Sequence, residues 1–280
     1  MERTLLVTGA SSGIGHHCAH ALRARGWRVF ASARRPEDVA RLRDEGLEAV
    51  PLDLACEASI EAALEAVLAA TGGRLDALFN NGAYGQPGAV EDLARDVLRA
   101  QFEVNLFGTQ SLTNRVIPVM RAQGHGRIVH NSSVLGLVSL PFRGAYNATK
   151  HALEALADAQ RLELAGSGIH VCLIEPGPIE SRFRENALAA FRRYIDSEHS
   201  PYRERYQGLL ARLEKAGPGG PGTLGPEAVA RKLVHALEAP RPRPRYYVTW
   251  PTWLLAGLKR ALPSRTLDAF LAALSRWENR

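Results

Sequence analysis

The chain contains 280 residues, 46% of them hydrophobic and 23% charged, which is enough for a sizeable buried core. These proportions argue against a disordered, collagen-like or coiled-coil protein. Lysine and arginine exceed aspartate and glutamate by 35 − 29 = 6, but the basic residues are scattered along the chain. We therefore expect a solvated basic surface and no binding to nucleic acid.

The cysteine content predicts neither disulfides nor a metal site. Cys18, Cys56 and Cys172 form no Cys-x-x-Cys pair and no cluster with metal-ligand spacing, and their number is odd. The apolar run 5–7 stands near the start without a signal-peptide pattern, and no window reaches the roughly 18 apolar residues of a membrane-spanning helix. We therefore expect a cytoplasmic protein.

Short β-rich runs alternate with amphipathic helical segments through the first two thirds of the chain. We predict strands at residues 4–8, 28–32, 47–52, 77–80, 127–131 and 170–175. The segments between them, such as 13–25 and 59–71, carry apolar residues at helical spacing. Alternating strands and helices predict an α/β fold, a doubly wound parallel sheet of the Rossmann type with helices on both faces.

The alternation of strands and helices in the sequence ends after residue 177. A charged helical stretch over 182–215 precedes a Gly/Pro-rich run at 217–222, and we predict a mobile substrate flap over 182–225 with its hinge in that run. A helix at 227–237 and a last strand at 246–249 complete a catalytic domain over 1–250.

Residues 251–280 are predicted to form a C-terminal helical extension, in which an amphipathic helix over 253–277 is broken at Pro263. Its apolar positions favour packing on the body or on a second subunit. Peripheral contact with a membrane surface is the less favoured alternative.

A glycine-rich turn follows the first predicted strand, with the sequence Thr8-Gly9-Ala10-Ser11-Ser12-Gly13-Ile14-Gly15. Glycines let the backbone approach a pyrophosphate, and the helix that begins here offers free N–H groups and a partial positive charge. The position at the first strand-to-helix junction favours a dinucleotide-binding turn over an ordinary one.

The end of the second predicted strand bears on the choice between NAD and NADP. An acidic residue about 20 positions beyond the glycines would bind the ribose diol of NAD, but Arg34 and Arg35 stand here instead. Arginine suits the 2′-phosphate of NADP, although both residues could simply precede a helix starting at Pro36. Asp53, after the third strand, is placed either to meet the adenine edge or to cap the following loop.

Tyr146 and Lys150 are one helical turn apart and share a face. A neighbouring ammonium favours the phenolate and lowers the phenol pKa, which makes Tyr146 a plausible proton donor. Ser133 ends the fifth strand and Asn105 lies in the preceding helical segment. A serine hydroxyl at a carboxyl strand end can hydrogen-bond a substrate carbonyl, and an asparagine could hold a water near the lysine.

Over residues 3–250 the sequence resembles the short-chain dehydrogenase/reductase family, and most closely its hydroxysteroid and retinol dehydrogenase branch. The resemblance rests on the turn at 8–15, Asn80-Asn81-Gly82-Ala83, the four residues just described, and Pro176-Gly177. It implies that Tyr146 is the general acid/base, Ser133 polarises the carbonyl, Lys150 lowers the phenol pKa and binds the nicotinamide ribose, and Asn105 supports a relay water.

The resemblance also implies a cofactor site, with Arg34 at the position where NADP-preferring members carry a basic residue. The cofactor-binding residues it predicts are Gly9, Ser11, Ser12, Gly13, Ile14, Gly15, Arg34, Asp53, Leu54, Asn81, Gly82, Tyr146, Lys150, Pro176, Gly177, Ile179 and Ser181. Two departures from the family pattern occur. Gly82-Ala83 transposes the usual Ala-Gly, and Ser181 replaces a threonine that contacts the nicotinamide amide.

Apolar and aromatic residues in the variable segments predict a pocket for a bulky hydrophobic carbonyl. The candidate walls, each of which could equally be core, are Tyr84, Leu135, Val138, Phe142, Phe183, Phe191 and Tyr194, and we assign Ser133, Leu135, Phe142, Tyr146 and Phe183 to the substrate. The sequence thus predicts an NADP(H)-dependent oxidoreductase acting on a hydrophobic carbonyl or secondary alcohol.

Two alternatives remain open, a 3-oxoacyl thioester reductase and a non-catalytic NADP-binding regulator. The resemblance also implies a homodimer or homotetramer.

Overall fold

The computed structural model describes residues 2–215, 217 and 219–278 of the chain. Within this part, seven strands form one parallel sheet in the order β3-β2-β1-β4-β5-β6-β7. The strands are β1 (Arg3–Val7), β2 (Trp27–Ala33), β3 (Glu48–Pro51), β4 (Ala77–Asn80), β5 (Gly126–Asn131), β6 (Ile169–Glu175) and β7 (Arg245–Tyr247). Every predicted strand is confirmed to within two residues, and so is the doubly wound fold.

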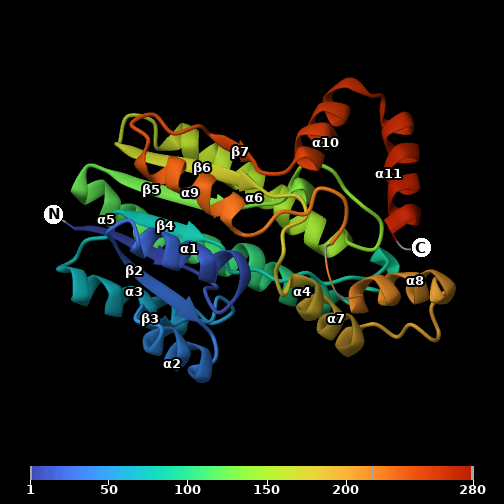
Figure 1. Ribbon diagram of the computed structural model, residues 1–280, viewed down its shortest axis with the longest axis horizontal. Helices are drawn as coiled ribbons and strands as arrows, with labels where there is room; N and C mark the ends of the chain where they lie inside the picture. The colour runs from blue at the N-terminus through green and yellow to red at the C-terminus, as the bar shows by residue number, and fades with distance from the viewer. Residues whose placement is uncertain (1, 216, 218, 279–280) are drawn as a thin grey trace.

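Helices cover both faces of the sheet because the central strands are apolar on both sides (Figure 1). Successive side chains of a strand point to opposite faces. Leu5 therefore packs in one cluster with α1 (Gly13–Arg23), α2 (Pro36–Asp44) and α9 (Glu227–Glu238). Leu6 packs in the other with α3 (Glu57–Thr71), α5 (Thr109–Gln123) and α6 (Gly144–Glu163).

The sheet order places the predicted functional segments at one edge. β1 lies between β2 and β4, so the strand order reverses at β1: β2 and β3 extend the sheet on one side, and β4 to β7 extend it on the other. The segments after β1, β4, β5 and β6 all begin at the carboxyl ends of these parallel strands. This reversal point is where ligands bind in open α/β sheets. α4 (Arg95–Phe102) and the π-helical turn η2 (Glu103–Gly108) connect β4 to α5.

The segment after β6, predicted as a flap over 182–225, is helical over much of that range. It contains α7 (Phe183–Tyr194) and α8 (Arg203–Glu214), which pack on each other and on the region around Leu93 and Val97. Tyr206 is fully buried there and its hydroxyl accepts a hydrogen bond from the Ala89 amide at 2.8 Å. The helical part of the predicted flap thus has an apolar core of its own. Part of the predicted hinge, Pro218, lies outside the described residues.

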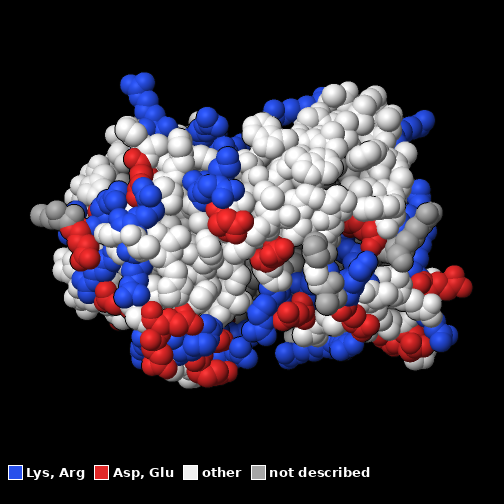
Figure 2. All heavy atoms as spheres, in the orientation of Figure 1, with Lys and Arg blue, Asp and Glu red and all other residues white. Residues whose placement is uncertain are grey.

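The C-terminal extension is a hairpin of α10 (Trp250–Ala261) and α11 (Ser264–Glu278), and the break at Pro263 is as predicted. Its inner face packs Leu255 and Leu271 against the segment after β5. Its outer face leaves three tryptophans, at positions 250, 253 and 277, 57%, 59% and 54% exposed. Figure 2 shows few charges over this hairpin. Within the described residues, no helix is both long and apolar enough to cross a membrane.

Candidate active site

The glycine-rich turn between β1 and α1 is shaped by close backbone approaches. Gly9 and Gly13 have φ angles of +65° and +57°, which L side chains rarely adopt. A Cβ atom on Gly15 would lie 2.4 Å from the Gly9 carbonyl oxygen. These positions therefore require glycine for the turn itself, and the turn brings Ser11, Ser12 and Ile14 to the amino end of α1. The first amides of that helix have no intrahelical acceptor, so they are available to an anion.

The Thr8 hydroxyl holds the segment after β4 against this turn. It accepts hydrogen bonds from the amides of Asn81 and Gly82 at 2.9 and 2.8 Å. The Asn81 side chain donates in turn to the carbonyls of Thr8 and Gly9 at 3.0 and 3.1 Å. Gly82 packs against Gly9 and Leu54, whereas Ala83 has no positive φ. The Gly82-Ala83 transposition is thus accommodated without backbone strain.

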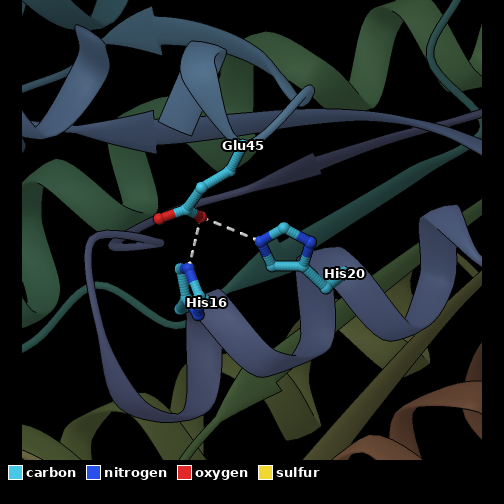
Figure 3. A group of neighbouring side chains, drawn as sticks. All are labelled: His16, His20 and Glu45. Carbon is cyan, nitrogen blue, oxygen red and sulfur yellow. Dashed lines mark hydrogen bonds and ion pairs between the residues drawn. The ribbon is translucent and has the colours of Figure 1, made fainter. Parts of the chain in front are cut away.

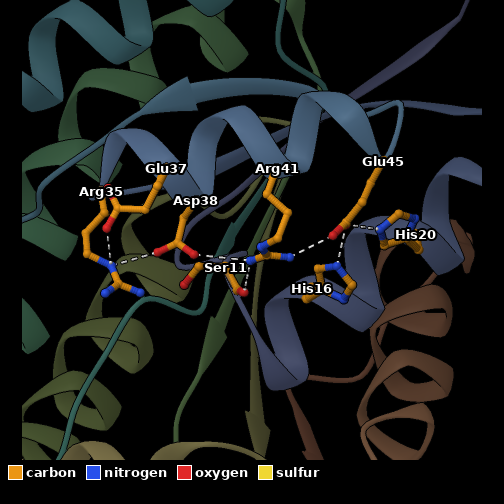
Figure 4. Close-up of polar contacts among 8 residues, drawn as sticks. All are labelled: Ser11, His16, His20, Arg35, Glu37, Asp38, Arg41 and Glu45. Carbon is orange, nitrogen blue, oxygen red and sulfur yellow. Dashed lines mark hydrogen bonds and ion pairs between the residues drawn. The ribbon is translucent and has the colours of Figure 1, made fainter.

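Arg34 and Arg35 have different surroundings at the end of β2. Arg35 forms ion pairs with Glu37 at 3.4 Å and Asp38 at 2.9 Å (Figure 4). The exposed Arg34 has no ion pair to any described residue. Asp53 accepts a hydrogen bond from the Ala55 amide at 3.0 Å, which is the loop-capping arrangement. Of these residues, Arg34 is the one whose charge is free to meet a ligand.

Tyr146 and Lys150 lie one turn apart on α6, as their spacing predicts, with the Lys150 Nζ 5.6 Å from the centre of the Tyr146 ring. Lys150 is buried, and its Nζ donates to the Asn131 carbonyl at 2.7 Å. Ser133 begins the short 3-10 helix η3 (Val134–Gly136), where its hydroxyl accepts from the Leu135 amide at 3.1 Å. The sheet edge and α6 therefore bring these three predicted residues together.

Asn105 lies in η2, whose wide π-helical turn is a frequent feature of functional sites. Its side chain donates to the Tyr84 carbonyl at 2.9 Å and accepts from the Tyr84 amide at 3.1 Å. It also donates to the Thr149 hydroxyl at 3.3 Å. The side chain thus fixes the loop after β4 to α6, an anchoring role that the sequence did not reveal.

The electrostatics differ from expectation at Tyr146. Burial among apolar neighbours raises the pKa of the phenol above its ordinary value, and its interaction with the Ser133 hydroxyl acts in the opposite direction. The net shift is therefore opposite to the one expected from Lys150 alone. Burial instead lowers the pKa of Lys150 to about 8, although the charge of Glu154 acts to raise it. Within the protein chain, Tyr146 therefore holds its proton firmly.

The residues after β6 face the glycine-rich turn. A Cβ atom on Gly13 would lie 2.9 Å from the Ser181 Cβ, so these two segments are in contact. The Pro176 carbonyl accepts from the Val134 amide at 2.8 Å, and Gly177 packs closely against the Thr249 hydroxyl. Ile179 forms a parallel bridge with Leu224. These contacts hold the predicted cofactor residues on two sides of one site.

The residues predicted to line the substrate pocket divide into those that lie near Tyr146 and those that pack in the protein core. Phe183 lies against Tyr146, with ring centres 5.2 Å apart, and Leu135 and Val138 share a cluster with Tyr146 and the C-terminal hairpin. Phe191, a candidate wall, is core, because it is 2% exposed and packs on Tyr206.

Two of the remaining candidates, Phe142 and Tyr194, pack in or near the core of α7 and α8. The centre of the Phe142 ring lies 5.6 Å from the ring centres of both Tyr202 and Tyr206, and Tyr194 packs on the apolar cluster that contains Tyr206. Tyr84 is half-buried, and its backbone is held by Asn105.

Two features of the site were missed from the sequence. Arg41 on α2 donates to the Ser11 carbonyl in the glycine-rich turn at 2.5 Å. Leu255 and Leu271 complete the apolar surroundings of Tyr146 from the C-terminal hairpin. Both contacts join segments far apart in the sequence. The only sequence signals for them are the arginines of the segment that forms α2 and the amphipathic pattern of the C-terminal residues.

Comparison with known proteins agrees with this geometry. A family model described as short chain dehydrogenase matches residues 3–190. The chain is 42% identical over 97% of its length to 94% of the uncharacterized oxidoreductase YbbO of Escherichia coli. It is 34% identical over 89% of its length to 78% of human 17-beta-hydroxysteroid dehydrogenase type 1.

A solved short-chain dehydrogenase from Streptomyces avermitilis superimposes with a TM-score of 0.77 at 31% identity, over 99% of this chain and 97% of that one. The chain therefore belongs to the short-chain dehydrogenase/reductase family and is an oxidoreductase of that family.

Solved relatives differ in their cofactor. An actinorhodin polyketide ketoreductase, 30% identical over 88% of this chain and 95% of that one with a TM-score of 0.71, is described with NADPH. A family member from Burkholderia phymatum, 26% identical over 92% of each chain with a TM-score of 0.76, is in complex with NAD.

Proposed function

We propose that this protein is an NADP(H)-dependent oxidoreductase that moves a hydride between the nicotinamide and a hydrophobic carbonyl or secondary alcohol. The observation that carries the proposal is the Tyr146 phenol, which lies beside Lys150 and Ser133 and is surrounded by apolar side chains. When bound, the cofactor supplies or accepts the hydride. We propose carbonyl reduction as the direction, in which Tyr146 donates the proton that the carbonyl oxygen takes up.

The surrounding residues each have a task in this proposal. Ser133 orients the substrate carbonyl with its hydroxyl, and Tyr146 donates the proton that the carbonyl oxygen needs. Lys150 keeps a positive charge beneath the phenol and is fixed by the Asn131 carbonyl. Asn105 and Asn81 hold the loop after β4 in place, so that they position the site.

The residues present fit a phosphorylated dinucleotide. The free amides at the start of α1 would hold the pyrophosphate, and the tight turn through Gly9 and Gly15 leads the backbone into that helix end. Arg34, which has no ion pair among the described residues, would bind the 2′-phosphate. We therefore propose NADP as the cofactor.

We propose a bulky, apolar carbonyl substrate because of the C-terminal hairpin. Leu255 and Leu271 place the inner face of α10 and α11 beside Tyr146, and Phe183 covers the ring from α7. These surroundings suit a steroid-, retinoid- or lipid-like compound, because polar substrates would lose hydrogen bonds to water there.

The proposal is tested by following NADPH oxidation across a panel of hydrophobic ketones, aldehydes and 3-oxoacyl thioesters. Turnover of the hydrophobic ketones or aldehydes is expected. Turnover of the thioesters alone would instead identify an acyl thioester reductase. Tight NADPH binding with no turnover on any compound would overturn the enzyme assignment and favour a regulatory NADP-binding protein.

The rate of carbonyl reduction should depend on pH through the protonation state of Lys150. Its cation is present below a pKa of about 8 and is lost above it, so kcat/KM should fall several-fold between pH 8 and pH 10. A Lys150→Arg variant retains its charge through this range. The residual activity of this variant should show no fall in kcat/KM between pH 8 and pH 10. A fall with the same midpoint pH in both proteins would assign the pH dependence to another group.

An ion pair fastens the C-terminal hairpin beside the site. Glu278 on α11 pairs with Arg143, next to α6, at 2.5 Å, and both side chains are largely buried. Glu278→Gln should raise KM for a hydrophobic substrate several-fold and leave NADPH affinity unchanged, because it loosens only the substrate side. Asp268→Asn, on the exposed face of the same helix, is the matched control. Equal effects of both variants would contradict the role of the ion pair.

We also propose a cytoplasmic homodimer or homotetramer. The exposed side chains of Phe107 and Leu162, on η2 and α6, support self-association, and the free cysteines of the described residues fit a reducing compartment. Sedimentation with and without lipid vesicles measures the oligomeric state and any membrane contact together.

A further inference from the structure

Two histidines and a glutamate converge on the surface between α1 and α2 (Figure 3). The Nε2 atoms of His16 and His20 lie 2.5 and 2.9 Å from the same Glu45 carboxylate oxygen. All three side chains are about one-third exposed. One ligand atom from each residue lies within 4.8 Å of the other two. The fold therefore brings together three possible metal ligands, which the search for cysteine motifs in the sequence did not reveal.

We propose that His16, His20 and Glu45 bind a divalent transition metal of the zinc type. Two imidazoles and one carboxylate suit Zn²⁺ better than Mg²⁺ or Ca²⁺, which prefer oxygen ligands. Histidines four residues apart on a helix present both rings on one face, the spacing found in helical zinc sites. Partial exposure gives the ion a path from solvent and leaves room for water as a fourth ligand.

The two nitrogen–oxygen distances, 2.5 and 2.9 Å, are somewhat shorter than a tetrahedral ion needs. Ligand atoms about 2.1 Å from a metal are separated by roughly 3.4 Å in a tetrahedron. The two imidazole nitrogens need to move less than about 1 Å away from the carboxylate oxygen to reach that separation, which side-chain rotation supplies. Each imidazole must then carry its remaining proton on Nδ1, so that the Nε2 lone pair faces the ion.

Arg41 orients the carboxylate from behind. It pairs with the second oxygen of Glu45 at 2.7 Å and is itself held by Asp38 and the Ser11 carbonyl (Figure 4). The carboxylate is therefore held in place, as a ligand anchored by an outer partner should be.

Other histidine–carboxylate pairs of the described residues do not offer this donor set. His125 pairs with Asp76 and His199 with Asp196, each a single imidazole with a single carboxylate. His17 is next to His16 on α1 but is not part of the cluster. It therefore provides a matched control, because its replacement removes one histidine from the same helix without touching the proposed ligands.

The test titrates Zn²⁺ into the full-length, untagged protein in competition with a chromogenic zinc indicator. All proteins carry Cys56→Ser, because that exposed thiol could itself bind zinc. We expect the parent and the His17→Ala variant to take up the same number of zinc ions. His16→Ala and His20→Ala should each lose one high-affinity equivalent, and Arg41→Ala should weaken it by about tenfold.

A second measurement does not depend on the variants. Co²⁺ bound at this site should show the visible absorption of a cobalt ion with nitrogen and oxygen ligands, and no thiolate charge-transfer band. Uptake of zinc that is identical in the parent, His16→Ala and His20→Ala proteins would overturn the proposal. So would the failure of the parent protein to compete with the indicator for even one equivalent.

Discussion

Tyr146→Phe should lower kcat for carbonyl reduction by about 10³-fold while changing the NADPH dissociation constant by less than about twofold. A positioned general acid contributes roughly 10² to 10⁴ in rate, and phenylalanine keeps the ring but removes the proton. The contacts of the aromatic ring with Phe183 and the C-terminal hairpin remain available to phenylalanine. Steady-state turnover and fluorescence titration of NADPH measure the two quantities.

Tyr202→Phe is the matched control, because it removes a phenol hydroxyl from the residue just before α8, which packs on the core of α7 and α8 and not beside Tyr146. Its turnover should stay within about twofold of the parent. Circular dichroism establishes that both variants fold. Unchanged turnover in Tyr146→Phe would remove this residue from the chemistry, and a large loss of NADPH affinity would show that the phenol acts through cofactor binding instead.

The parts of the site that could be predicted from sequence are those fixed by local spacing. The turn at Gly9–Gly15 follows from glycines at a strand-to-helix junction, and Tyr146 and Lys150 share a face because one helical turn separates them. The sheet then gathers these segments because parallel strands end at one edge. Periodicity and a single topological rule thus account for the core of the site.

The parts that could not be predicted depend on contacts between distant segments. Nothing local distinguishes Arg41 from the other arginines of the chain, yet α2 brings it to the Ser11 carbonyl. The charged stretch after β6 looks like a solvated flap, but its buried residues match the surface around Val97. The four-residue spacing places His16 and His20 on one face of α1, but only helix packing brings Glu45 to them. Sequence spacing carries no information about such meetings.

The phenol pKa shows a further limit of reasoning from pairs. The Tyr-x3-Lys spacing predicts an ammonium near the phenol, and the distance of 5.6 Å confirms the neighbourhood. Burial of both groups outweighs that attraction, so the pKa of Tyr146 rises and that of Lys150 falls to about 8. The sign of a pKa shift depends on the whole surroundings, which the sequence does not display.

Arg34→Ala should weaken NADPH binding by about one to two orders of magnitude and NADH binding by less than about twofold. Hydrogen bonds between a guanidinium and a phosphate contribute roughly 1.5–3 kcal/mol, and only NADPH carries the 2′-phosphate. Arg34 can offer this interaction because, among the described residues, no carboxylate neutralises it. Fluorescence titration with each nucleotide measures the ratio of the two affinities.

Arg35→Ala is the matched control, because the neighbouring guanidinium is already paired with Glu37 and Asp38. It should change the affinity for both nucleotides by a similar, small factor. An equal loss of NADPH and NADH binding in Arg34→Ala would remove this residue from the phosphate site. A selective loss of NADPH in Arg35→Ala would show that the ion pairs open on binding, and that the 2′-phosphate displaces the carboxylates from Arg35.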